Sequence, residues 1–181
     1  MIQHQGDPTR CVVLLPGVRY FSQAPLLWFA REAAQARGWS ALEMDERAPE
    51  GEDPFAWMRD RAQHALEATD ADLVVVVGKS LGSAAAPLVS GPAVWLTPLL
   101  TRPEILEALA AAESPALLVG SPADPSWGEG ELPDNELLEV LELPGLDHSL
   151  QLDGDPLGSL DVLRTVTDRL GAFFDRVSDS P

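Results

Sequence analysis

Short apolar runs alternate with longer amphipathic segments along the whole chain. The run at 72–77, DLVVVV, holds four consecutive valines and lacks the apolar–polar alternation of a half-exposed strand. Such a run is typical of a strand that is buried on both faces of a parallel sheet. Segment 135–145 carries both helix and strand signals. Further strands are predicted at 11–17, 40–46, 92–99 and 115–121.

The segments between these strands have the composition and spacing of amphipathic or alanine-rich helices. Asp53 and Pro54 give the clearest start signal, because Asp is a good N-cap and Pro fits the first helical position. The alternation of strands and helices predicts one α/β domain over residues 1–181, with a parallel sheet covered by helices. Helices are predicted at 25–38, 53–69, 102–113 and 155–177, with a shorter one directly after residue 80.

Composition narrows the classes of partner without choosing a fold. The chain carries a formal net charge of −17, which disfavours nucleic acids and anionic membrane surfaces as partners. The single cysteine, Cys11, excludes an intramolecular disulfide and a cysteine-rich metal site. No signal-peptide pattern and no apolar stretch of membrane-spanning length are visible. We therefore expect a cytoplasmic protein without membrane insertion, and the sequence does not indicate its oligomeric state.

Residues 78–82, GKSLG, allow two interpretations. A phosphate-binding P-loop requires an earlier glycine, but that position is Leu73 and four valines follow it, so the loop is missing. A G-x-S-x-G nucleophile elbow fits instead, because a strand runs into Gly78, turns sharply at Ser80 and enters a helix of small residues. Lys79, inside this motif, is the only lysine of the chain; a general preference for arginine explains this as readily as a function does.

A serine nucleophile needs a base, and the base needs an acid that orients it. Asp124 and His148 each follow a predicted strand, and the chain order Ser80, Asp124, His148 is that of α/β-hydrolases. Asp147 is a rival acid, but a residue adjacent to the histidine can rarely turn its carboxylate onto that ring. Asp124 is therefore the preferred partner of His148.

The oxyanion of a tetrahedral intermediate needs hydrogen-bond donors. The backbone N–H of Leu81, directly after the nucleophile, is one candidate. The second is the N–H of Val18, in the loop after the first predicted strand, LLPGVRY. Arg19 and Tyr20 then border the pocket as candidate substrate contacts, although a surface role fits them equally well. Trp127, in the loop of the predicted acid, is a candidate pocket wall.

The GKSLG motif, the later Asp and His, and the segment LLPG together resemble a small α/β-hydrolase-fold serine hydrolase. More closely, LLPGVRYFSQAPLLWFA, VVVVGKSLGSAAAP and VWLTPLL are similar to compact bacterial members of the α/β-hydrolase family, and the resemblance covers nearly the whole chain. It implies an esterase-like enzyme with an acyl-enzyme intermediate and Ser80, Asp124 and His148 as the catalytic triad. The implied substrates are small-molecule esters or thioesters with small or exposed acyl groups, and no metal or organic cofactor is implied.

The chain also departs from this family. Only one predicted strand and one predicted helix lie between Ser80 and Asp124, which leaves no room for the cap domain of many relatives. The N-terminal antiparallel strands are not evident, so we expect a minimal, mostly parallel sheet of about six strands with helices on both faces. A non-catalytic ligand- or protein-binding module on the same fold stays open as an alternative, as does acyl transfer to an acceptor other than water.

Overall fold

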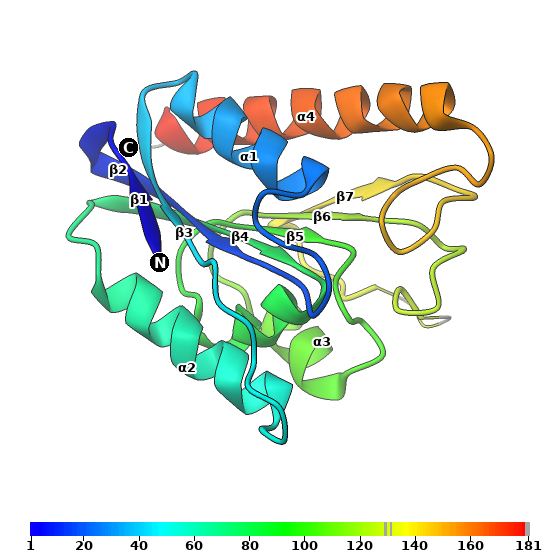
Figure 1. The fold of residues 1–181 in the computed structure, drawn as a ribbon, viewed down its shortest axis with the longest axis horizontal. Helices are drawn as coiled ribbons and strands as arrows, with labels where there is room; N and C mark the ends of the chain where they lie inside the picture. The colour runs from blue at the N-terminus through cyan, green and yellow to red at the C-terminus, as the bar shows by residue number, and fades with distance from the viewer. Residues whose placement is uncertain (129, 131, 180–181) are drawn as a thin grey trace.

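The computed structural model describes residues 1–128, 130 and 132–179, which form one sheet with helices on both of its faces (Figure 1). The strands of this sheet are β1 (Ile2–His4), β2 (Asp7–Leu15), β3 (Trp39–Glu43), β4 (Leu73–Lys79), β5 (Ala93–Leu96), β6 (Ala116–Gly120) and β7 (Leu138–Glu142). The helices are α1 (Pro25–Gln35), α2 (Pro54–Glu67), α3 (Pro103–Ala110) and α4 (Pro156–Ser178), with the 3₁₀ helix η1 (Ser80–Leu88) after β4.

The sheet order is β1-β3-β2-β4-β5-β6-β7, and every neighbouring pair except β1–β3 is parallel. Because the strands are parallel, the carboxyl ends of β2, β4, β6 and β7 meet at one edge of the sheet. The loops that follow these ends carry the predicted site residues. Crossover connections between parallel strands place helices on both faces, as the strand–helix alternation of the sequence predicted.

Strand β1 corrects one expectation from the sequence. We expected no N-terminal antiparallel strand and about six strands in all, but Ile2 pairs with Glu43 and His4 with Ala41 in an antiparallel ladder. The segment IQH is short, largely exposed and not an apolar run, so it lacks the pattern that marks a buried strand. The ladder covers the outer edge of β3 and adds a seventh strand to those of the described residues.

Two apolar layers lie on opposite faces of the sheet. Alternate residues of β2 point to opposite sides, so Val12 belongs to the core beneath α1 and α4, whereas Val13 belongs to the core above α2, η1 and α3. Figure 1 shows the same division, with α1 and α4 on one side of the sheet and α2 and α3 on the other. Strand β4 is the central strand of the sheet and contributes valines to both layers. Packing on both faces therefore fixes the position of its carboxyl end, where η1 begins.

Local signals account for most of the remaining elements. Helix α2 begins at Pro54, and the Asp53 carboxylate accepts the backbone N–H of Phe55 at 3.0 Å, as the cap signal predicted. The ambiguous segment 135–145 contains β7, which pairs in parallel with β6. No helix among the described residues is both long enough and apolar enough to cross a bilayer.

Candidate active site

Ser80 lies at the sharp turn between β4 and η1. Its φ angle is 52°, a left-handed conformation that non-glycine residues rarely adopt and that raises the local backbone energy. The glycines on either side allow the turn to pack closely. A Cβ atom on Gly78 would lie 2.6 Å from the Trp95 ring, and one on Gly82 would lie 2.5 Å from the carbonyl oxygen of Leu15. This close packing holds the turn and presents the Ser80 side chain at the edge of the sheet.

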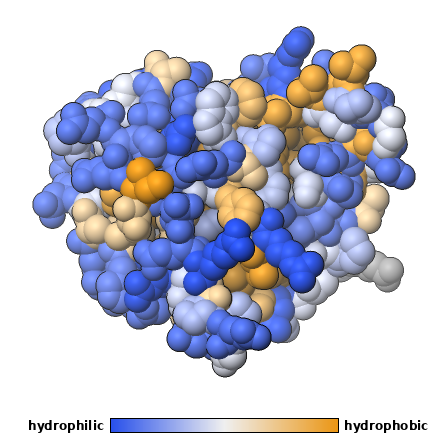
Figure 2. All heavy atoms as spheres, viewed as in Figure 1, coloured by the Kyte–Doolittle hydropathy of each residue, from blue (hydrophilic) through white to orange (hydrophobic). Residues whose placement is uncertain are grey.

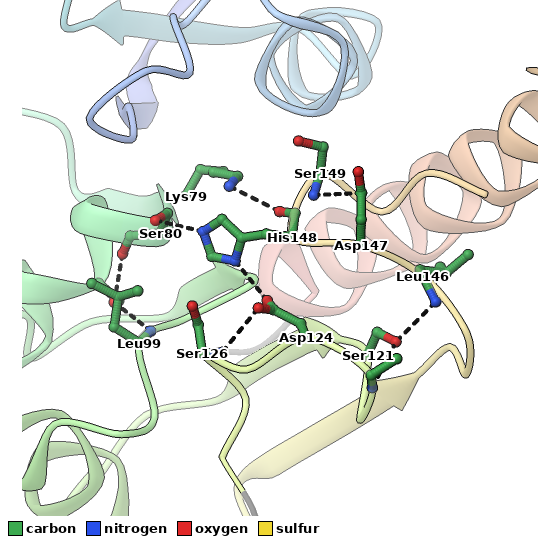
Figure 3. A network of polar contacts seen from close by, with 12 residues as sticks. Lys79, Ser80, Leu99, Ser121, Asp124, Ser126, Leu146, Asp147, His148 and Ser149 are labelled. Atoms are coloured by element: carbon green, nitrogen blue, oxygen red, sulfur yellow. Dashed lines mark hydrogen bonds and ion pairs between the residues drawn. The ribbon is translucent and has the colours of Figure 1, made fainter. Parts of the chain in front are cut away.

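Three side chains from three different loops meet at this edge (Figure 3). The Ser80 Oγ and His148 Nε2 atoms are 2.8 Å apart, and His148 Nδ1 lies 2.6 Å from Asp124 Oδ2. A carboxylate accepts hydrogen bonds only, so the contact with Asp124 places a proton on Nδ1 and leaves Nε2 free to accept from the Ser80 hydroxyl. The arrangement can move a proton from the hydroxyl to the imidazole.

Asp124 is held from both sides of its carboxylate. It is 2% exposed, and its second oxygen, Oδ1, accepts the backbone N–H of Ser126 at 2.9 Å. The rival acid, Asp147, makes different contacts. Its carboxylate accepts the N–H groups of Ser149 at 2.8 Å and of Gln151 at 2.9 Å, so it shapes the loop that carries His148. The structure therefore brings Asp124 to the imidazole and gives Asp147 a role within its own loop.

The candidate oxyanion donors lie beside the Ser80 turn. Leu81 occupies the first turn of η1, where backbone N–H groups have no partner within the helix. Gly17 and Tyr20 exchange backbone hydrogen bonds of 3.1 and 3.4 Å, which places Val18 and Arg19 at the tip of a tight turn. A Cβ atom on Gly17 would lie 3.3 Å from the Ser80 Cβ, so this turn packs against the elbow. Val18 and Leu81 both line a cavity of about 110 Å³.

The three candidate substrate contacts have different surroundings. Arg19 is exposed at the tip of its turn. The Tyr20 hydroxyl accepts the backbone N–H of Leu26 at 2.9 Å, so it caps the start of α1, and burial raises the pKa of Tyr20 above its ordinary value. Tyr20 also lines a cavity of about 360 Å³ between α1, the His148 loop and α4. Arg19 thus lies at the exposed tip of the turn beside the elbow, whereas Tyr20 is held against the start of α1 and lines the neighbouring cavity.

Trp127 is a core residue rather than the predicted pocket wall. Its side chain is 5% exposed, and its indole N–H donates to Glu142 Oε1 at 3.0 Å. The ring packs directly on the backbone of Gly120, where a Cβ atom would lie only 2.1 Å from it. The loop after β6 folds inward over this glycine, so the indole anchors the loop of Asp124 instead of facing a substrate.

Lys79 is a buried residue of this site to which the sequence assigned no role. Its ammonium donates to the backbone carbonyl of His148 at 3.0 Å and lies 4.9 Å from the centre of the Tyr20 ring. Burial lowers the pKa of Lys79 to about 8, against the opposing effect of the Asp124 and Asp147 carboxylates. The signal available in the sequence was the isolated lysine inside the motif, but its target could not be read there.

The surface near the site carries a group of exposed hydrophobic residues. Hydrophobic residues gather over the amino-terminal end of α4, in the upper right of Figure 2, where Leu157 is 73% and Leu160 59% exposed. Leu160 also lines the cavity of about 360 Å³ beside the His148 loop.

In the part of the chain that the structure describes, no group of three or more His, Cys, Asp or Glu side chains is placed to hold a metal ion.

Comparison with known proteins relates this architecture to solved structures. No protein-family model matches the chain, and no curated protein matches it by sequence. Est1E from Butyrivibrio proteoclasticus, in a structure with bound ferulic acid, superimposes with a TM-score of 0.71 at 14% identity, over 97% of this chain and 93% of that one. An α/β serine hydrolase without a lid from Xanthomonas campestris gives 0.66 at 13% identity, over 99% and 89%.

The esterase domain of a Rhodothermus marinus protein is also similar, with a TM-score of 0.64 at 14% identity and 97% of each chain covered. The chain has the α/β-hydrolase fold. Within this α/β-hydrolase fold there is no cap domain: residues 81–123, all of them described, hold only the rest of η1, then β5, α3 and β6 with their connections. The predicted fold class is confirmed.

Proposed function

We propose that the protein is a serine hydrolase that cleaves carboxylic esters or thioesters through an acyl-enzyme intermediate. The observation that carries this proposal is the continuous contact from Ser80 Oγ through the His148 ring to Asp124, at 2.8 and 2.6 Å. These three groups come from separate loops and meet with the spacing that nucleophilic catalysis needs. The left-handed backbone at Ser80 supports it further, because strain of this kind gathers at functional sites.

In the proposed reaction, His148 Nε2 takes the proton of the Ser80 hydroxyl as the oxygen attacks the substrate carbonyl carbon. Asp124 stabilises the resulting imidazolium, and the N–H groups of Leu81 and Val18 bind the oxyanion. The carbon–oxygen or carbon–sulfur bond then breaks, and the leaving alcohol or thiol takes the proton from Nε2. Water, deprotonated by His148, attacks the acyl-enzyme; the bond from the acyl carbon to Ser80 Oγ then breaks, the acid is released, and the His148 imidazolium returns its proton to Ser80 Oγ.

The surroundings of the site favour small or exposed acyl groups. No cap domain covers the elbow within the described part of the chain, and the His148 side chain is 36% exposed although its partner Asp124 is buried. The cavity of about 360 Å³ beside the His148 loop has the size of a small-molecule pocket; Ser149 and Tyr20 line it, but the side chains of Ser80, Asp124 and His148 do not. Est1E, a similar fold, is known with bound ferulic acid, which agrees with a small carboxylic ester as the substrate class here. The strong negative charge favours neutral or cationic substrates.

A fluorophosphonate probe tests the proposal directly, because it reacts only with a serine that is activated by a base. We expect labelling of the wild-type protein and none of Ser80→Ala, with both proteins folded by circular dichroism. Hydrolysis of p-nitrophenyl esters and acyl-CoAs of increasing chain length would then define the acyl group. A folded wild-type protein that is neither labelled nor active on this panel would contradict the proposal and favour a binding module.

A further inference from the structure

Lys79 has an environment that is costly for a cation. Its side chain is 2% exposed, and the ammonium forms no ion pair with any residue that the structure describes. An apolar side chain of similar length would fill the same volume without the loss of hydration that a buried charge suffers. The only side-chain hydrogen bond of Lys79 among the described residues is the one to the His148 carbonyl oxygen, at 3.0 Å.

That bond connects the elbow to the backbone of the candidate base. Lys79 and Ser80 are consecutive residues at the end of β4, and each contacts a different part of His148. Lys79 reaches the backbone carbonyl, and Ser80 reaches Nε2 of the ring. Figure 3 shows the Lys79 amine directed at the His148 backbone while the imidazole turns toward Ser80 and Asp124. One rigid strand end therefore contacts both the main chain and the side chain of the same histidine.

The loop that carries His148 has few other attachments of this kind. Asp147 organises the loop internally by accepting the N–H groups of Ser149 and Gln151. Outside the loop, the N–H of Leu146 donates to Ser121 Oγ at 3.1 Å. Leu146 and Leu150 bury their side chains in the core and hold the loop against the sheet, but these apolar contacts and the internal bonds do not tie the His148 backbone to the elbow. The Lys79 contact supplies that connection at His148 itself.

We propose that Lys79 is a positioning residue, which uses its buried ammonium to hold the His148 backbone so that the imidazole stays within reach of both Ser80 and Asp124. This inference rests on the proposed hydrolase function and adds a fourth side chain to its machinery. Proton transfer requires heavy atoms within hydrogen-bond distance, and small displacements of a catalytic group reduce rates strongly. Tyr20 contributes by placing its ring against the same ammonium.

The hydrogen bond from the Lys79 ammonium to the His148 carbonyl should depend on pH, because Lys79 can lose its charge. Four groups face this side chain: Tyr20 from the loop after β2, Asp124 from the loop after β6, and Asp147 and His148 from the loop before α4. The pKa of Lys79 lies at about 8, so a moderately alkaline solution neutralises the ammonium and weakens its bond to the carbonyl. We expect the wild-type labelling rate to decline as the pH rises through this value.

The test compares fluorophosphonate labelling rates of the wild type, Lys79→Met and Lys79→Gln between pH 6 and 10. Both variants should react about 10- to 100-fold more slowly at pH 7 and should lack the decline near pH 8. Their kcat on a p-nitrophenyl ester should fall with little change in KM. Lys79→Met should unfold at the wild-type temperature or above, because an apolar side chain replaces a buried charge. Arg164→Met, which removes an exposed cation from α4, should match the wild type.

Each result supports or overturns the inference. Slower labelling of a stable variant together with the lost alkaline decline supports it. Wild-type rates in both variants or an unchanged pH profile would show that Lys79 has no positioning role. Loss of folded structure in both variants would also overturn the inference, because Lys79 would then be needed for folding rather than for the placement of His148. A wild-type protein that the probe does not label at any pH would instead contradict the proposed hydrolase function, and so the two failures are distinguishable.

Discussion

The Asp124→Asn variant changes one hydrogen-bonding group of the site and preserves its shape. Asp124 Oδ1 accepts the Ser126 N–H at 2.9 Å, and Oδ2 faces His148 Nδ1 at 2.6 Å. An asparagine keeps the Ser126 bond only with its oxygen at the Oδ1 position, which places its NH₂ group against Nδ1. Nδ1 must then accept, so the ring proton moves to Nε2. In that tautomer Nε2 no longer accepts from the Ser80 hydroxyl.

The loss should be large because the wrong tautomer removes the base without removing the serine. A reversed tautomer in such a triad reduces the rate by roughly 10³- to 10⁴-fold, which corresponds to about 4–5.5 kcal/mol in activation free energy. We expect this loss in kcat for p-nitrophenyl acetate and in the fluorophosphonate labelling rate. Thermal unfolding should show a folded variant, because Asn fills the same buried volume as Asp124 and retains the Ser126 bond.

Asp147→Asn is the matched control. Its side-chain oxygen can still accept the N–H groups of Ser149 and Gln151, so the His148 loop should keep its shape and the rate should stay close to that of the wild type. Full activity in Asp124→Asn combined with a large loss in Asp147→Asn would refute the reasoning and identify Asp147 as the orienting acid.

Three further predictions concern stability. Gly82→Ala should destabilise the fold by about 1–3 kcal/mol in urea titration, because its Cβ would meet the Leu15 carbonyl at 2.5 Å, whereas Gly130→Ala, with open space around it, should not. Trp127→Phe should lower the unfolding free energy by about 1 kcal/mol through the lost bond to Glu142 and leave kcat unchanged; a selective rise in KM would restore the pocket-wall interpretation. Arg31→Met should cost about 3 kcal/mol, because it leaves the buried Glu43 carboxylate without its cation. Burial opposes the charged form of Glu43, but hydrogen bonds from Ser22, Arg31 and His4 hold its pKa below the ordinary value. The stabilisation by the charged carboxylate is therefore complete above about pH 4.5 and is lost as the pH falls through the lowered pKa. A stability difference between the wild type and Arg31→Met that stays constant down to pH 3 would contradict this prediction.

The features that the sequence predicted best are those that depend on local pattern. The valine run, Gly78 and Gly82 together indicate a strand, a close turn and a helix, and the structure has β4, the left-handed turn at Ser80 and η1 in that order. Parallel strands place their carboxyl ends together, so the positions of Asp124 and His148 after successive strands were enough to expect them near Ser80. Their proximity is thus a consequence of topology that the chain order already contains.

The features that were missed depend on contacts between distant segments. The strand IQH has no apolar pattern, and only its ladder with β3 makes it a strand. The inward fold of the Trp127 loop depends on space above Gly120, and a glycine at the end of an apolar run is the one trace of it in the sequence. The target of Lys79 lies 69 positions away, and neither its burial nor its partner follows from the motif that contains it.

The uncovered elbow has a consequence for what happens after the first chemical step. A lid over an active site keeps competing nucleophiles away from a reactive intermediate. Here an ester formed on Ser80 would be open to solution on the side of the imidazole, which is 36% exposed, because no cap domain lies over it among the described residues, although Ser80 itself is 9% exposed. Dissolved alcohols, amines and thiols would then compete with water for the acyl group in proportion to their concentration and nucleophilicity. The ratio of products would be decided by the medium more than by the protein.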